Sequence, residues 1–175
     1  MNVLTDRMIR AARLESNLYE EVEADQGATG QALAVVVLSS VAAGVATVAT
    51  GGIGGIVLAT IGALGGWVVW AYLTYLIGTR LLPEPQTKAD VGELLRTLGF
   101  ASSPGVIRVV GIVPGLTMPS FLVAAVWMLV TMVIAVRQAL DYTSTWRAIG
   151  VCVIGFLVQV VILALLVAAL GTPRA

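Results

Sequence analysis

Few side chains in this chain are of the types that perform catalysis or bind metals. The 175 residues include no histidine, which removes the commonest general base and the commonest metal ligand. Without histidine, neither a Ser-His nor a Cys-His nucleophile can form. The single cysteine, Cys152, lies in an apolar run, where a free thiol behaves as a small hydrophobic side chain. The sequence therefore predicts a protein that is not an enzyme, with no catalytic residue, no metal site and no cofactor.

Acidic residues are confined to polar segments. They lie within residues 1–25, in the gap 80–96, and at Asp141. None falls inside an apolar run, so a proton relay of buried acids is not expected. The glycines of 51–55 stand between two apolar runs rather than between a strand and a helix, which argues against a nucleotide-binding loop.

Arg108 is the one charged residue in the middle of an otherwise apolar stretch. An arginine at the centre of a bilayer costs about 2.5–3.5 kcal/mol, so it must pair, reach the headgroups or face a wet cavity. The polar side chains that could partner it are Ser102, Ser103, Gln138 and Gln159. Two interpretations stay open: an anionic lipid or ligand site of Arg108, Ser102 and Ser103, or an arginine bonded to backbone carbonyls freed near Pro104.

Three runs without Lys, Arg, Asp or Glu make up most of the chain. They cover residues 26–79 (54 residues), 109–136 (28 residues) and 148–173 (26 residues). A transmembrane helix needs about 20 mostly apolar residues. Charged residues make up 11% of the chain, against about 25% in soluble domains. The sequence predicts an all-α, polytopic membrane protein, and its ten basic and ten acidic residues give no attraction to nucleic acid.

Glycine and proline divide these runs into a predicted bundle of five transmembrane helices. The predicted spans are residues 31–49, 56–78, 98–116, 119–137 and 146–170. A tight turn is expected at 51–55, and a short amphipathic helix at the membrane surface is expected after a capping box at 87–90. The third span contains Pro104 and Pro114 besides Arg108, so a layout with four spans stays open.

The basic residues predict the orientation, because cytoplasmic loops carry the excess of Lys and Arg. With five spans and a cytoplasmic N-terminus, eight Lys and Arg residues lie inside and only Arg174 lies outside. With four spans the count is eight inside to two outside. Both layouts place the N-terminus in the cytoplasm. Arg137 and Arg147 flank a short loop, where the rule is strongest, which favours five spans.

Small residues recur at helical spacing in the first apolar run. The predicted helix-packing residues are Gly51, Gly55, Ala59 and Ala63, with the pair Gly62 and Gly66. This spacing lets two helix backbones approach closely. It predicts either a packed hairpin within the chain or a dimer face, and the contact within the chain is favoured.

The N-terminal segment 1–27 is expected to form a cytoplasmic amphipathic helix over residues 2–25, ahead of a membrane domain at 28–175. Its arginines come first and its acids follow. Two interpretations stay open: the basic half lies on anionic headgroups, or the helix is solvated and packs on the rest of the protein.

The C-terminal half resembles the Yip domain family, the Ypt/Rab-interacting membrane proteins and their prokaryotic relatives. The residues that carry the resemblance are Leu98 to Arg108, Ile112 to Gly115, Val126-Trp127, Ala135 to Tyr142, and Trp146 to Ile149. The resemblance implies five spans, a cytoplasmic N-terminus and no catalytic residues. Eukaryotic members bind small GTPases and carry an Asp-Leu-Tyr-Gly-Pro motif. Here only Asn17-Leu18-Tyr19-Glu20 is partly similar, which argues against GTPase binding and indicates the bacterial branch.

Three functions follow as hypotheses. The first is a scaffold that organises the bacterial cytoplasmic membrane through helix packing and lipid contact, with lipids and other membrane proteins or itself as partners. The second is an accessory subunit that docks on a larger membrane complex. The third is a small transporter or channel, which the lack of intramembrane carboxylates and of an inverted repeat disfavours.

Overall fold

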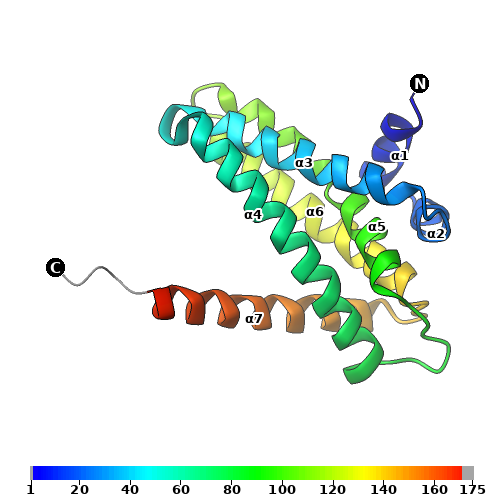
Figure 1. Cartoon of the computed structure of the whole chain (residues 1–175). Coiled ribbons are helices and arrows are strands. Elements are labelled where there is room, and N and C mark those ends of the chain that lie inside the picture. The colour runs from blue at the N-terminus through cyan, green and yellow to red at the C-terminus, as the bar shows by residue number, and fades with distance from the viewer. Residues whose placement is uncertain (1, 171–175) are drawn as a thin grey trace.

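The computed structural model describes residues 2–170, and these residues form a bundle of helices without strands (Figure 1), which confirms the all-α prediction. In chain order the elements are α1 (Val3–Ala12), α2 (Ser16–Ala24), α3 (Ala28–Ala46), α4 (Val48–Leu76), the π-helical turn η1 (Ile77–Leu81), α5 (Val91–Ala101), the 3₁₀ helix η2 (Ser103–Ile112), α6 (Thr117–Ala139) and α7 (Thr145–Leu170). Arg174, which entered the charge count, lies outside the described residues.

Four stretches of helix among residues 2–170 are long and apolar enough to cross a membrane. They are Ala28–Ala46, Gly51–Leu81, Thr117–Ala139 and Thr145–Ile162. They correspond to four of the five predicted spans. The chain leaves α3 at Ala46 and enters α4 at Val48, so the turn begins before the predicted segment 51–55. Gly52 instead makes a kink inside α4, with a φ of 59° that glycine adopts without steric cost.

The predicted span 98–116 is not one continuous helix. Asp90 and Glu93 form a capping box that starts α5 at Val91, so the cap lies one turn later than predicted. Pro104 stands at the start of η2, where it cannot continue the α-helical hydrogen bonds, and the chain changes from α to 3₁₀ winding there. Leu94, Leu98 and most of the second half of α5 are buried against other helices, and the expected place of this helix at the membrane surface stays a prediction. The five-span layout stays a prediction.

α5 and η2 together run beside α3 in the same direction. A Cβ atom added to Gly99 would lie 2.6 Å from the Cβ of Ala32, and one added to Gly105 would lie 2.0 Å from Oγ of Ser39. One added to Gly111 would lie 3.0 Å from the Cβ of Ala46. The three glycines therefore let the backbone of this segment lie directly against α3 from near its start to its end.

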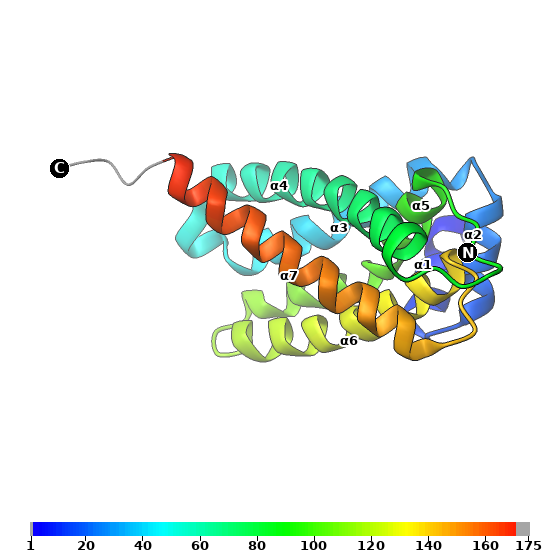
Figure 2. The ribbon, with the colours of Figure 1, turned by 90° about the horizontal axis from the view of Figure 1, so that it is seen from below.

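The two ends of the bundle differ in charge. Apart from Arg108, every charged residue within 2–170 lies in the segments 6–25, 80–96 or 137–147. These segments gather at one end, whereas the α3–α4 turn and the turn at 113–116 lie at the opposite end (Figures 1 and 2). The opposite end carries no charged residue among those described. The bundle therefore has one charged end and one uncharged end.

The N-terminal segment is a helical hairpin, so the prediction of one helix over 2–25 is wrong. The chain reverses at Leu14, which has a φ of 65°. The Arg7 guanidinium joins the two helices because it lies 2.9 Å from carboxylate oxygens of both Glu21 and Asp25. Arg10 lies 2.6 Å from Glu21 as well. Two of the three arginines are thus engaged by acids of the hairpin itself, which supports packing on the protein over binding of headgroups.

The loops at the charged end are held together by Glu84, whose side chain is 6% exposed. Its carboxylate accepts hydrogen bonds from the backbone N–H (2.9 Å) and the hydroxyl (2.7 Å) of Thr143, just before α7. These hydrogen bonds, led by the backbone one, lower the pKa of Glu84 to about 2. Glu84 therefore fixes the segment after α4 to the start of α7.

Candidate functional site

η2 presents one face with a period of three residues, as a 3₁₀ helix requires. Ser102, just before η2, is followed at this spacing by Gly105, Arg108 and Gly111. Gly105 and Gly111 bring this face against α3, and Gly111 also approaches Ser120 of α6. Arg108 is thereby held between α3 and α6, with its guanidinium directed into the bundle.

The guanidinium of Arg108 has few partners. It donates from Nη2 to Oγ of Ser39 at 3.4 Å and contacts the Sδ of Met128. Its Nε is buried and has no hydrogen-bond partner. The ring of Phe121 lies 5.7 Å from Cζ, a distance at which a cation is attracted to the ring face. None of the ion pairs of residues 2–170 includes Arg108.

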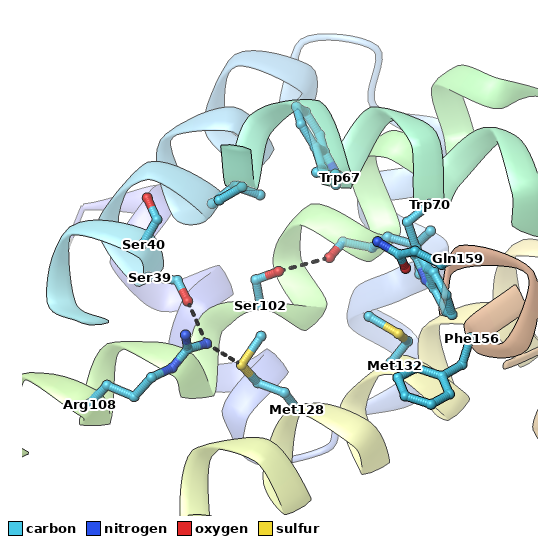
Figure 3. Close-up of a pocket in the computed structure, with 14 residues that line it drawn as sticks. Ser39, Ser40, Trp67, Trp70, Ser102, Arg108, Met128, Met132, Phe156 and Gln159 are labelled. Atoms are coloured by element: carbon cyan, nitrogen blue, oxygen red, sulfur yellow. Dashed lines mark hydrogen bonds between the residues drawn. The ribbon is translucent and has the colours of Figure 1, made fainter. Parts of the chain in front are cut away.

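Arg108 lines a cavity of about 340 Å³ in the middle of the bundle (Figure 3). Its polar walls come from Ser39 and Ser40 on α3, from Ser102, and from Gln159 on α7. The other walls are apolar, and they include Trp67, Trp70, Met128, Met132 and Phe156. Arg108 and Gln159 lie on opposite sides of the cavity in Figure 3. The cavity thus combines one cation, three hydroxyl groups and one amide with an aromatic and thioether surface.

The structure brings together only part of the predicted site. Ser102 and Gln159 line the cavity with Arg108. Ser103 does not, because its hydroxyl donates to the carbonyl of Phe100 at 2.6 Å and only caps the end of α5. Gln138 lies at the charged end, where its amide donates to Glu20. Ser103 and Gln138 are therefore not part of the site.

Sequence reasoning missed Ser39 and Ser40, which belong to the cavity wall. Both are buried although they lie in the charge-free run. Ser40 donates to Thr60 of α4 at 3.2 Å, and Ser39 accepts from Arg108. Two adjacent hydroxyl residues in the middle of a predicted span are the sequence signal that would have indicated a polar interior.

An apolar groove of about 750 Å³ lies between α6 and α7 and adjoins the cavity. The cavity and the groove share Trp70, Met132 and Phe156. The groove continues along Leu129, Val153 and neighbouring side chains. α7 leaves the bundle beyond the groove, and every residue of α7 from 160 onward whose side chain is described is exposed (Figure 1). The groove therefore joins the cavity to the outer surface of the bundle.

The glycines of the helix-packing set predicted on α4 make no close backbone contact within the chain. A Cβ atom added at Gly51, Gly55, Gly62 or Gly66 would meet nothing within 4 Å. α3 and α4 pack elsewhere, with the side chain of Ile56 lying on Gly44. Ala63 and Gly66 line the Arg108 cavity. We call the other four residues, Gly51, Gly55, Ala59 and Gly62, the α4 small-residue face.

A polar pocket of about 700 Å³ lies at the charged end, away from Arg108. Its lining includes Glu20, Glu23, Glu93 and Asp141 together with Arg137. Burial and then repulsion from Glu93 and Asp141 raise the pKa of Glu23 to about 7. Within residues 2–170, no cluster of three or more His, Cys, Asp or Glu has the arrangement that holds a metal ion.

Comparison with known protein families identifies the fold. The family model of the Yip1 domain matches residues 15–167. The chain belongs to the Yip1 domain family. The Yip1 match includes α2 to α6 and almost all of α7, and therefore every residue that lines the Arg108 cavity. Together with the apolar helices, membership of the Yip1 family makes the chain a multi-pass membrane protein. No curated protein and no solved structure matches this Yip1 chain.

Proposed function

We propose that the chain is a non-enzymatic scaffold of the Yip type in a bacterial cytoplasmic membrane. It organises the membrane by packing its helices against a second copy or another membrane protein, and by contact with lipid. The observation that carries this proposal is the α4 small-residue face, where a Cβ atom added to any of the glycines would meet nothing within 4 Å. Small residues on an open helix face favour close approach of another helix within a membrane.

Disulfide cross-linking tests the packing of α4. In a Cys152→Ala background, Ala59→Cys places one thiol in the α4 small-residue face, and Leu122→Cys places one on the exposed surface of α6. Leu122 is 64% exposed, so it is a matched control for random collision in the membrane. We expect oxidation in native membranes to give a covalent dimer from Ala59→Cys and little from Leu122→Cys.

The products distinguish the alternatives. A dimer of the chain supports a scaffold that assembles with itself. A stoichiometric adduct with one other protein favours the accessory-subunit hypothesis. Equal products at both positions, or none at either, would refute packing through α4. Solute or ion flux in proteoliposomes of the purified chain would favour the transporter or channel hypothesis instead.

We further propose that residues 98–116 cross the membrane, which gives five spans with the N-terminus in the cytoplasm. The alignment of Gly99 with Ala32 and of Gly111 with Ala46 supports this layout, because a segment that follows α3 along its length crosses wherever α3 crosses. The uncharged end supports it as well, since both turns there lack Lys and Arg, as expected of loops outside the cytoplasm.

Labelling with a membrane-impermeant maleimide tests the layout. In the Cys152→Ala background, Leu116→Cys places a thiol in the turn before α6, and Lys88→Cys places one in the segment before α5. Five spans predict that intact spheroplasts label Leu116→Cys and leave Lys88→Cys unlabelled until the cells are opened. With four spans, both positions would label only in opened cells.

A further inference from the structure

The Arg108 cavity and the α6–α7 groove together have the composition of a lipid site. We propose that they bind one phosphate-bearing membrane lipid, with the phosphate at Arg108 and an acyl chain in the groove. This inference deepens the proposed contact with lipid and rests on it.

The guanidinium of Arg108 has unused capacity to donate. Arginine carries five N–H donors in a planar fork that suits phosphate. Only the long contact to Ser39 and the contact to the weak acceptor Met128 are used, and the buried Nε has no acceptor. A buried donor without an acceptor costs free energy, so the cavity favours a ligand that supplies acceptor oxygens.

The ligand must bring the negative charge, because the chain does not. The acidic residues of 2–170 all lie in the segments at the charged end, and none pairs with Arg108. Arg108 contacts Ser39 in the middle part of α3 and Met128 in the middle part of α6. A charge at this depth is costly unless it is paired, reaches the headgroups or faces water, and an anionic ligand in the cavity would pair it. A phosphate there is neutralised by the guanidinium and can accept a hydrogen bond from the hydroxyl of Ser39, which only accepts in the present contact with Arg108. The hydroxyls of Ser40 and Ser102 already donate to acceptors of the protein.

The groove supplies the reason for a lipid rather than a soluble anion. It opens the cavity towards the side of the bundle, between α6 and α7, and its lining is apolar except for Thr145, the indole N–H of Trp70 and the thiol of Cys152. The side chains at the junction, Trp70, Met132 and Phe156, suit the first methylene groups of an acyl chain. A head that binds in the cavity and a tail that leaves through the groove require an amphiphile.

Native mass spectrometry with defined lipids tests this site. The purified protein is exchanged into mild detergent containing phosphatidylglycerol and diacylglycerol with the same acyl chains. The variants are Arg108→Gln, Arg108→Lys and Val153→Trp, which fills the groove without touching Arg108. Arg13→Gln is the matched control, because Arg13 is exposed and forms no ion pair or hydrogen bond through its side chain. Circular dichroism and elution volume show which variants remain folded.

We expect the wild type and Arg13→Gln to retain one phosphatidylglycerol, and Arg108→Lys to keep most of it. Arg108→Gln should retain phosphatidylglycerol about tenfold or more weakly, which is the factor expected for the loss of a hydrogen bond to a charged group. Val153→Trp also lowers retention, although the arginine is intact. An excess of inorganic phosphate leaves the lipid bound.

Four results would overturn the proposal. In the first, Arg108→Gln retains as much phosphatidylglycerol as the wild type. In the second, diacylglycerol binds as well as phosphatidylglycerol. In the third, inorganic phosphate displaces the lipid, and in the fourth, a protein partner that depends on Arg108 co-purifies in place of lipid. The first two results would show that Arg108 does not recognise the lipid phosphate. The third would indicate that the ligand is a soluble anion, and the fourth that it is a carboxylate of a partner protein. Cross-linking through Ala59 is measured separately, so the packing function and this lipid site can fail independently.

Discussion

The indole Nε1 of Trp127, in α6, donates a 2.8 Å hydrogen bond to the carbonyl of Ala12, the last residue of α1. Carbonyl groups at the end of a helix have no partner within the helix, so an external donor satisfies one of them. The bond joins residues 115 positions apart in the sequence. It attaches the first helix to the membrane bundle, together with the ion pairs between α1 and α2.

We expect Trp127→Phe to loosen α1 selectively. The ring remains apolar, but the carbonyl of Ala12 loses its donor, which costs about 1 kcal/mol. Hydrogen–deuterium exchange should therefore become faster in α1 and stay unchanged in α3. Trp146, which is 81% exposed, offers a matched control in Trp146→Phe. Unchanged exchange in α1 of Trp127→Phe would show that the bond does not hold the hairpin.

Replacing Glu23 should change stability in a pH-dependent way. The pKa of Glu23 is raised to about 7 from 4.5, so the folded state holds this proton more tightly and stability falls as pH rises through that window. Glu23→Gln should therefore unfold at a higher temperature than the wild type at pH 8 and at nearly the same temperature at pH 4.5. Asp141→Asn removes one repelling carboxylate and should weaken the pH dependence of the wild type. A constant difference between Glu23→Gln and the wild type across this range would contradict the assignment.

Glu84 should act in the opposite sense at lower pH. Its pKa is lowered to about 2 from 4.5, so its contribution is complete above pH 4.5 and is lost as the pH falls towards 2. Glu84→Gln should lower the unfolding temperature at pH 7, and it should flatten the acid side of the stability curve. Thermal unfolding from pH 7 to pH 2 measures both effects. The idea fails if the acid limbs of variant and wild type have the same slope.

Gly99 should tolerate no side chain. A methyl group there would lie 3.1 Å from backbone atoms of Ala32, which cannot move aside as a flexible side chain can. Overpacking of this kind costs about 1–3 kcal/mol, so Gly99→Ala should lower the unfolding temperature. Gly65 lies inside α4 with nothing within 4 Å, and Gly65→Ala is expected to be neutral or stabilising by up to about 1 kcal/mol. Equal effects at the two glycines would refute the close contact of α5 with α3.

The apolar runs were sufficient to predict four of the helices, because long stretches without charge leave few structures other than membrane-spanning helices. They did not predict where helices pack. The α4 glycines have ideal spacing for close contact, yet α3 approaches α4 closely at Gly44, against the side chain of Ile56. Spacing indicates which faces allow approach, but only the tertiary arrangement decides which face is used.

The site was predicted through Arg108 alone, since an isolated charge in an apolar run is visible in the sequence. The residues that surround Arg108 were harder to predict from the sequence. Ser103 is adjacent in sequence to Ser102, but its hydroxyl bonds to the preceding turn, as serine side chains commonly do. Ser39 is distant in sequence, and it reaches Arg108 only because Gly105 lacks a side chain.

The 3₁₀ winding of η2 has a consequence for length. Gly99 lies beside Ala32 and Gly111 lies beside Ala46. Twelve residues of this segment therefore cover the same length of the bundle as fourteen residues of α3. A 3₁₀ helix advances about 2.0 Å per residue against about 1.5 Å in an α-helix, so both paths measure about 21–22 Å. The segment formed by the end of α5 and by η2 is not one long helix, yet it extends as far along the bundle as the neighbouring part of α3. Deleting a single residue between Ser103 and Arg108 would shorten this reach and also turn Arg108 by about a third of a revolution, away from the cavity.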